Sequence, residues 1–182
     1  MNVGFDLDRI FIHSPPFVPG KIVDRFYKGK QDGKLKYRIP GRLEKLMRIF
    51  SHHSIFRPPI VKNVNYVKNL ALANTHKYYL ISSRFNFLKK RTSKLIQRYE
   101  LDRIFNAMYF NYSDDQPHNF KNKVVEELKL DMYVDDDLQL LRHLASNNSK
   151  TKFFWFNKKI NQKLSNNLFA ISNLSEIFLN KD

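Results

Sequence analysis

Two aspartates stand one residue apart near the start of the chain. Asp6 and Asp8 follow the apolar residues 3–5, and the apolar pattern resumes at Ile10. Such a pair has three chemical uses: nucleophile, proton donor and part of a hard-cation site. If residues 3–5 form a buried parallel strand, both carboxylates lie at its C-terminal end, where open α/β sheets bind ligands. The pair is therefore a candidate active site, although an isolated Asp-x-Asp more often simply ends a strand.

A second group of carboxylates supports a cation site. Mg²⁺ keeps several waters and takes only one or two protein carboxylates, so Asp6 and Asp8 need an acidic partner from elsewhere in the chain. The sequence provides that partner at residues 135–137, three consecutive aspartates that directly follow an apolar run. The two acidic groups together favour a reaction that depends on magnesium.

Composition limits the class of protein. The chain has 182 residues, of which 42% are hydrophobic and 14% aromatic, and this is typical of one globular domain with its own core. No apolar stretch approaches the length of a membrane span, and no basic stretch followed by an apolar core opens the chain, so we expect a cytoplasmic protein. The absence of cysteine excludes disulfides and thiolate catalysis, and the histidines lack the spacing of a zinc site.

The net charge of +15 is concentrated in one part of the chain. Residues 9–77 contain 15 Lys and Arg against 3 Asp and Glu. A charge run of this kind is often only a solvated face, but its field can also attract an anionic substrate or a polyanion. Phe26, Tyr27 and Tyr37 lie among these basic residues, and exposed aromatics in a basic segment are typical of a surface for single-stranded nucleic acid or nucleotides.

The first 77 residues read as one strand followed by an irregular insertion. Three prolines within residues 15–19 predict a loop, and Asp32-Gly33 between basic residues suggests a hairpin. The next pattern predicts a helix with one apolar stripe, made of Leu43, Leu46, Met47 and Phe50. A second helix is predicted from Asn63.

From residue 77 onward short apolar runs alternate with helical patterns. The apolar runs predict strands at 78–81, 107–110, 132–134, 153–156 and 168–171. The helical patterns lie at 87–99, 120–128, 138–144 and 174–179. Such an alternation builds right-handed βαβ crossovers and a parallel sheet that is covered on both faces. We therefore predict an α/β fold, a Rossmann-like doubly wound parallel sheet, with a small, basic and partly helical insertion.

Polar residues follow the predicted strands in a recognisable order. They are Ser82-Ser83-Arg84 after the second strand, Lys121 at a helix start and Asp135-Asp136 after the fourth strand. Together with Asp6 and Asp8, this order and spacing resemble the haloacid dehalogenase (HAD) superfamily of phosphatases over the whole chain. The resemblance implies a single HAD-like domain, residues 1–182, with a basic cap insertion at 13–76.

The resemblance also implies a role for each residue. Asp6 would be the nucleophile that forms an aspartyl-phosphate, and Asp8 would be the general acid and then the base. Ser82 and Lys121 would complete the catalytic group by binding the phosphoryl oxygens. Ser83 and Arg84 would bind substrate. Mg²⁺ would be held by Asp6, Asp8 through its backbone carbonyl, Asp135 and Asp136.

Three of these assignments have competitors in the sequence. Lys123 is an alternative to Lys121, which we prefer because it stands in the first turn of the predicted helix. Ser83 is alternatively a helix cap, and Arg84 alternatively makes a surface ion pair.

The chain departs from the family pattern at two positions. Arg9 stands where the family usually has Gly, and Ile10 stands where Thr or Val is common. Neither change removes a reacting group, so the resemblance implies a Mg²⁺-dependent phosphatase that hydrolyses a phosphomonoester selected by a basic cap. The alternative is a module that binds nucleic acid or an anionic membrane, or a polynucleotide end phosphatase. Nucleotides, sugar phosphates, phosphoproteins and nucleic-acid ends all remain candidate substrates.

Overall fold

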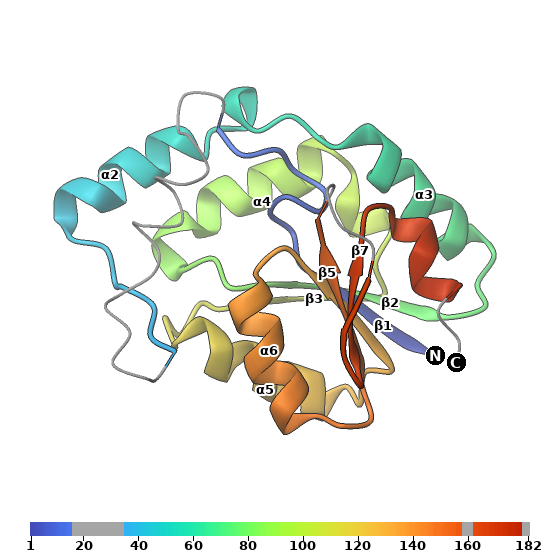
Figure 1. Ribbon diagram of the computed structural model, residues 1–182. Helices are drawn as coiled ribbons and strands as arrows, with labels where there is room; N and C mark the ends of the chain where they lie inside the picture. The colour runs from blue at the N-terminus through green and yellow to red at the C-terminus, as the bar shows by residue number, and fades with distance from the viewer. Residues whose placement is uncertain (16–34, 158–161, 180–182) are drawn as a thin grey trace.

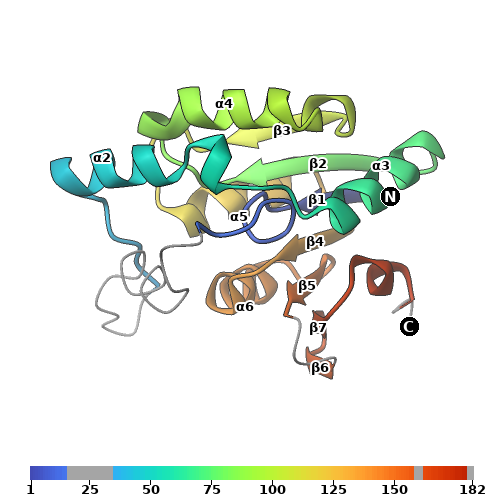
Figure 2. The same cartoon turned by 90° about the horizontal axis from the view of Figure 1, so that it is seen from above.

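A mostly parallel sheet runs through the middle of the molecule (Figure 1). The computed structural model describes residues 1–15, 35–157 and 162–179, and in this part the sheet has seven strands. Their order is β3-β2-β1-β4-β5-β7-β6, which can be followed across Figure 2, and among them only β6 is antiparallel to its neighbour. The strands are β1 Asn2–Phe5, β2 Lys77–Ser82, β3 Ala107–Phe110, β4 Met132–Asp135, β5 Lys152–Phe156, β6 Gln162–Ser165 and β7 Leu168–Ile171.

Helices cover both faces of this sheet. In Figure 1 α3 and α4 lie above it, whereas α5 and α6 lie below. The α-helices are α2 Arg42–Ser51, α3 Val61–Leu72, α4 Lys89–Arg98, α5 Pro117–Glu127 and α6 Leu138–Asn147. Short 3₁₀ helices are η1 Ser54–Phe56, η2 Asn86–Leu88, η3 Leu101–Arg103 and η4 Leu174–Phe178. The predicted doubly wound α/β fold is confirmed. None of the helices in the described ranges is both long and apolar enough to cross a membrane.

The two faces of the sheet carry separate hydrophobic cores. One core packs Val67 of α3 and Leu95 of α4 against β1, and the other packs Val124 of α5 and Leu141 of α6 on the opposite face. Strands buried on both faces must be apolar on both sides, which explains why their sequences read as continuous apolar runs.

Strand β1 lies at the centre of the sheet, between β2 and β4. A Cβ atom on Gly4 would lie 2.6 Å from Leu130 Cδ1 and 2.9 Å from Tyr133 Cδ2, so the close packing on this strand requires glycine. The strand ends at Phe5, and the chain turns at Arg9, which has a left-handed φ of 60°. The apolar residues that resume at Ile10 are buried in the core and do not extend β1.

Several element boundaries differ from the predictions. Residues 86–88 are a 3₁₀ turn before α4, and residues 174–178 are a 3₁₀ helix. Helix α5 begins at Pro117, a residue suited to the first turn because its missing N–H has no partner to lose. Strand β6 was not predicted, since an edge strand with the sequence Gln-Lys-Leu-Ser lacks the apolar run of a buried strand.

The insertion contains both predicted helices. Helix α3 packs on the sheet through Val67, whereas α2 lies near the end of the molecule to which the strands point (Figures 1 and 2). The hairpin predicted at Asp32-Gly33 lies outside the described residues, as do Phe26 and Tyr27. The division into one domain with a cap at 13–76 stays a prediction.

Helix α2 presents its predicted apolar stripe to solvent. The side chains of the stripe are between 64% and 73% exposed; they are Leu43, Leu46, Met47 and Phe50. By contrast, Arg48 on this helix and His52 at its C-terminal cap are buried. These two polar residues face inward and line the cavity described below.

Candidate active site

The predicted site residues meet at one edge of the sheet. Asp6 follows β1, while Ser82 and Asp135 end β2 and β4, the two strands that pair with β1. The carboxyl ends of parallel strands lie at a common edge, so these side chains converge with Lys121 of α5 on one cavity. The cavity has a volume of about 320 Å³, within the usual range for small-molecule sites.

Lys121 lies between Asp6 and Asp135 and forms an ion pair with each. Its Nζ donates to Asp6 Oδ1 at 2.7 Å and to Asp135 Oδ2 at 2.6 Å, and all three residues are at most 5% exposed. Tyr133 also donates its hydroxyl to Asp135, at 3.0 Å. Lys123, the competing lysine, has a side chain that is 75% exposed and points to Glu127. Geometry therefore favours Lys121 at the site.

Burial changes the proton affinity of this cluster. It raises the pKa of Asp6 to about 6, and the charge of Lys121 offsets the effect only in part. Burial also disfavours the Lys121 ammonium, but Asp135 and Asp6 together outweigh it and hold the pKa of Lys121 well above its usual value. The lysine therefore stays charged, and Asp6 is mostly a carboxylate above about pH 6.

The acidic residues fit a hard cation. Oxygens of Asp6, Asp135 and Asp136 all lie within 4.8 Å of one another. Burial first, and then the neighbouring Asp135 and Asp6, raise the pKa of Asp136. A set of carboxylate oxygens this close together suits Mg²⁺ or Mn²⁺. The Asp8 carboxylate contacts Arg57 and Arg84 and not this cluster. Its predicted part in the metal site would therefore rest on its backbone carbonyl.

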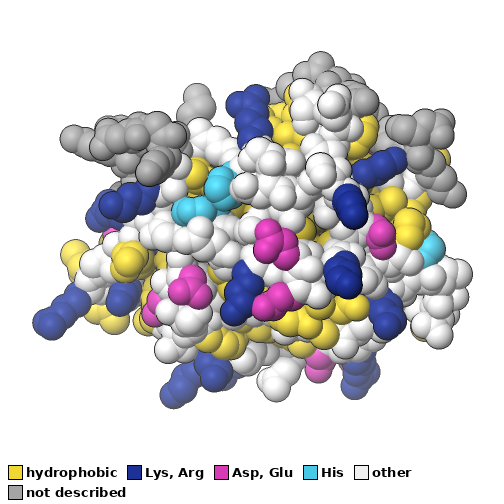
Figure 3. Space-filling model, turned by 90° about the horizontal axis from the view of Figure 1, so that it is seen from below, with side chains coloured by type: hydrophobic (Ala, Val, Ile, Leu, Met, Phe, Trp, Pro, Cys, Tyr) yellow, Lys and Arg dark blue, Asp and Glu magenta, His cyan; other side chains and the backbone are white. Residues whose placement is uncertain are grey.

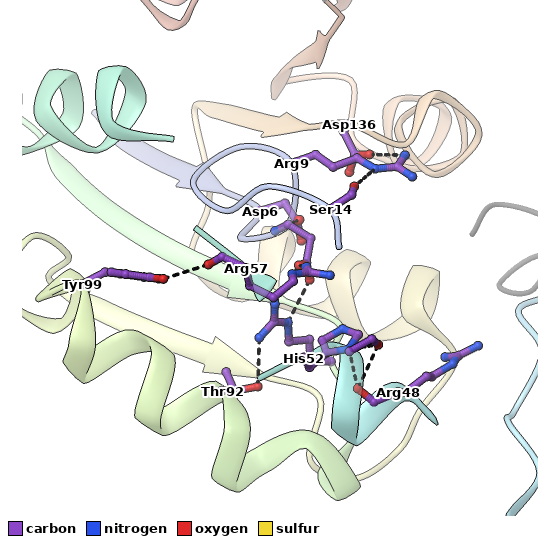
Figure 4. Close-up of polar contacts among 12 residues, drawn as sticks. Asp6, Arg9, Ser14, Arg48, His52, Arg57, Thr92, Tyr99 and Asp136 are labelled. Atoms are coloured by element: carbon purple, nitrogen blue, oxygen red, sulfur yellow. Dashed lines mark hydrogen bonds and ion pairs between the residues drawn. The ribbon is translucent and has the colours of Figure 1, made fainter. Parts of the chain in front are cut away.

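Arg9 makes the second basic contact of the acidic cluster. Its NH1 donates to Asp136 at 2.9 Å and its Nε to Ser14 at 3.1 Å, as Figure 4 shows. Next in the chain, Asp137 accepts hydrogen bonds from backbone N–H groups at the start of α6 and from the Tyr37 hydroxyl. Asp137 is thus a helix cap, whereas Asp136 faces the cluster.

The Asp8 carboxylate is held by two arginines. Arg84 donates to it twice, from Nε at 2.9 Å and from NH2 at 2.7 Å, and Arg57 donates to the same carboxylate from its NH2. Meanwhile the backbone N–H of Asp8 donates to Asp6 Oδ2 at 2.8 Å. Asp8 therefore joins the acidic cluster to a pair of guanidinium groups. Arg84 is 5% exposed, so its ion pair is internal and not the surface pair considered as an alternative.

The two serines after β2 also line the cavity. Ser82 is 1% exposed. Ser83 is not a helix cap, because the residues that cap η2 and α4 are Phe85 and Leu88. Its hydroxyl is buried and has no hydrogen-bond partner among the residues the structure describes, so it is available to a ligand.

Several cavity residues were not recognised as site residues from the sequence. Among them are five that the insertion contributes, namely Tyr37, Arg38, Arg48, His52 and Arg57. Tyr37 was expected to be exposed for nucleic-acid stacking, but it is 7% exposed and bonded to Asp137, so that expectation is wrong. Arg57 precedes two prolines and read as part of a chain break. The only available signal was the surplus of basic residues in the insertion.

Comparison with known proteins places the fold. No protein-family model matches the sequence, and no curated protein matches it. Solved structures match it over more than 90% of both chains. One described as a beta-phosphoglucomutase from Thermotoga maritima has 15% identity and a TM-score of 0.63, covering 98% of this chain and 96% of its own. The fold is that of the haloacid dehalogenase-like hydrolases.

Two further matches show the same HAD-like fold. A haloacid dehalogenase-like family hydrolase from Xanthomonas campestris has 13% identity and a TM-score of 0.59, covering 96% of this chain and 91% of its own. An archaeal beta-phosphoglucomutase from Pyrococcus sp. strain ST 04 has 10% identity and a TM-score of 0.56, covering 97% and 96%. The resemblance inferred from the motifs is thus confirmed at the level of the fold.

Proposed function

We propose that the protein is a Mg²⁺-dependent phosphatase that hydrolyses a phosphomonoester through an aspartyl-phosphate on Asp6. The position of Asp6 carries the proposal. This buried carboxylate follows the central strand, lines the cavity and accepts hydrogen bonds on both oxygens, from Lys121 and from the backbone of Asp8. Few structural roles require a carboxylate so confined, whereas a nucleophile must be held in one orientation.

The chain's own residues supply most of the chemistry. Asp6 attacks phosphorus, the bond from phosphorus to the leaving oxygen breaks, and Asp8 donates a proton to that oxygen. Water then attacks the aspartyl-phosphate while Asp8 takes up its proton, which releases inorganic phosphate and regenerates Asp6. Lys121 places a positive charge beside the phosphoryl oxygens.

Asp6, Asp135 and Asp136 would hold the magnesium ion. When bound, it would supply the charge that neutralises the phosphoryl group during transfer. Asp135 accepts a hydrogen bond from the backbone N–H of Asp137 at 3.0 Å and another from Lys121, so the fold itself orients this carboxylate.

Substitution of Asp6 tests the proposal. Asp6→Asn should lower kcat for p-nitrophenyl phosphate by about 10⁴-fold or more, because the amide is not an adequate nucleophile. The circular dichroism spectrum and the melting temperature would show that the variant is folded. Asp102→Asn, a change on the exposed η3, is the matched control and should leave kcat unchanged. Wild-type turnover by the Asp6 variant would rule the mechanism out.

The binding-module alternative receives less support from the described residues. Arg48 and Arg57, two of the basic residues of the insertion, are directed into the cavity and are buried. Figure 3 shows basic and acidic side chains interspersed over one face of the molecule, without separation by sign. If the alternative were correct, the protein would bind oligonucleotides or anionic vesicles with an affinity that falls steeply with salt, and would turn over no phosphomonoester.

A further inference from the structure

The charges that line the cavity are divided into two halves. On one side lie the carboxylates of Asp6, Asp135 and Asp136 with Lys121 and Arg9. On the other side lie arginines from the insertion and from the segment after β2, namely Arg48, Arg57 and Arg84. Figure 4 shows this arrangement, with Arg9 and Asp136 on one side of Asp6 and with Arg57, His52 and Arg48 on the other.

Several of these arginines meet at the same carboxylates. Arg57 and Arg84 both donate to the carboxylate of Asp8. Arg38 and Arg48 both contact Glu44, at 3.0 and 2.7 Å. A buried guanidinium is stabilised only when its donors find acceptors, so a buried donor that lacks an acceptor points to a ligand.

Arg57 has such a donor. Its side chain is 5% exposed, and its Nε has no hydrogen-bond partner in the described part of the chain. Burial first, and then the charge of Arg84, lower the pKa of Arg57 well below its usual value. The hydroxyl of Ser83 lines the same cavity, beside Arg84 in the chain, and it too has no partner among the described residues. Two buried donors on this side of the cavity are therefore available to an anionic ligand.

We propose that Arg57 and Arg84 bind a second anionic group of the substrate, a carboxylate or a second phosphate, and that this binding releases Asp8 for catalysis. The inference rests on the proposed phosphatase activity. Asp8 now faces the two guanidinium groups, whereas a general acid must face the leaving oxygen. A substrate anion that takes over these donors frees the Asp8 carboxyl group to turn toward the leaving oxygen.

The geometry also limits the size of the substrate. The backbone N–H of Asp8 donates to Asp6, and the carboxylate of the same residue contacts Arg57 and Arg84. The phosphoryl site and the second anion site therefore lie at the two ends of one aspartate. A cavity of about 320 Å³ holds a small molecule. The substrate class is therefore a compact phosphomonoester with a second anion a few bonds from the phosphate.

A matched pair of substrates tests this. Glycerol 3-phosphate and 3-phosphoglycerate differ only in a terminal hydroxymethyl group or carboxylate. With Mg²⁺, we expect kcat/KM to be about 10- to 100-fold higher for 3-phosphoglycerate, as charged hydrogen bonds to buried arginines imply. Part of the gain should be in kcat, because the second anion releases Asp8. Fructose 6-phosphate and fructose 1,6-bisphosphate give the same comparison for a second phosphate.

Variants assign the preference to the arginines. Arg57→Gln and Arg84→Gln should each reduce the preference for the second anion toward unity. Arg57→Lys keeps the charge and should retain part of the preference, and it serves as the test if the glutamine variants do not fold. Arg103→Gln is the control, since this arginine of η3 is 75% exposed and is not among the residues that line the cavity. A preference that persists in both glutamine variants would overturn the assignment.

A binding measurement separates this inference from the proposed function. Isothermal titration of the inert Asp6→Asn protein with the glycerol pair reports the anion site without turnover, and tighter binding of 3-phosphoglycerate supports it. Wild-type turnover of p-nitrophenyl phosphate with equal kcat/KM and equal binding for both members of each pair would refute the anion site and keep the phosphatase. Absence of all turnover would instead refute the phosphatase.

Discussion

Arg9 combines a backbone conformation that favours glycine, with φ of 60°, and a side chain that pairs with Asp136. The left-handed region costs a non-glycine residue about 1–2 kcal/mol. Arg9→Gly and Arg9→Ala both remove the ion pair, but only the alanine variant keeps the strain. We therefore expect Arg9→Gly to be more stable than Arg9→Ala by about 1 kcal/mol in urea unfolding, since the flexibility of unfolded glycine offsets part of the gain. Equal stabilities would show that the turn is not strained.

His52 should make the fold sensitive to acid. Burial first, and then the charge of Arg84, lower the pKa of His52 from 6.5 to about 3, so the folded protein holds it neutral. The unfolded chain binds the extra proton below pH 6.5, and the free energy of unfolding therefore falls as the pH falls from 6.5 toward 3. This loss is about 2 kcal/mol at pH 5. Urea unfolding should show a shallower pH dependence for the His52→Gln variant than for wild type.

Individual site residues differed in how well the sequence predicted them. Asp6 and Asp135 both line the cavity because they lie at the C-terminal ends of adjacent parallel strands, while their roles stay a prediction. Arg57 reaches the cavity only through the path of the insertion between two proline-containing breaks, and no periodic pattern encodes that path. The pairing of Asp8 with two arginines therefore could not be inferred.

At the scale of elements, Gly4 sets how closely the helices and strands pack around β1. Its missing side chain leaves room for Leu130 and Tyr133, and an added Cβ would lie less than 3 Å from both. Gly4→Ala should therefore lower the free energy of unfolding by about 1–3 kcal/mol, the usual cost of overpacking. Chemical denaturation measures this, and Gly41→Ala is the control because nothing lies within 4 Å of its added Cβ. Similar losses for both variants would contradict the packing argument.

Helix α2 illustrates what an element pattern does and does not predict. The spacing of Leu43, Leu46, Met47 and Phe50 correctly predicted a helix, since periodicity reports the secondary structure directly. Orientation is a separate matter, because an apolar stripe usually faces the core. Here the opposite stripe faces inward, since Arg48 lines the polar cavity. Strands 78–81 and 153–156 had no such ambiguity, as they are apolar throughout.

For the whole molecule, we expect Mg²⁺ to raise thermal stability. An ion that binds only the folded state adds about 2.7 kcal/mol at one hundred times its dissociation constant. The gain should increase as the pH rises through about 6 and again through about 8, because the protons on Asp6 and Asp136 must leave before these carboxylates can bind the ion. Thermal melts with Mg²⁺ or EDTA should show the effect in wild type and Asp102→Asn, and much less in Asp135→Asn. Melting curves that do not respond to Mg²⁺ would exclude the metal site.

The overall architecture was the most predictable level. Alternation of short apolar runs with helical patterns leaves few arrangements, because crossovers are right-handed and parallel strands need cover on both faces. Edge strand β6 escaped prediction because its sequence, Gln-Lys-Leu-Ser, lacks the apolar run of a strand that is buried on both faces.

The position of Lys121 between Asp6 and Asp135 bears on the order of events after synthesis. Many metal sites assemble only as the ion binds, because bare carboxylates repel one another and keep the chain open. Here a side chain already supplies positive charge between two of the carboxylates, at 2.7 and 2.6 Å. The chain can therefore fold first and take up its cation afterwards, so we expect folding not to require the metal.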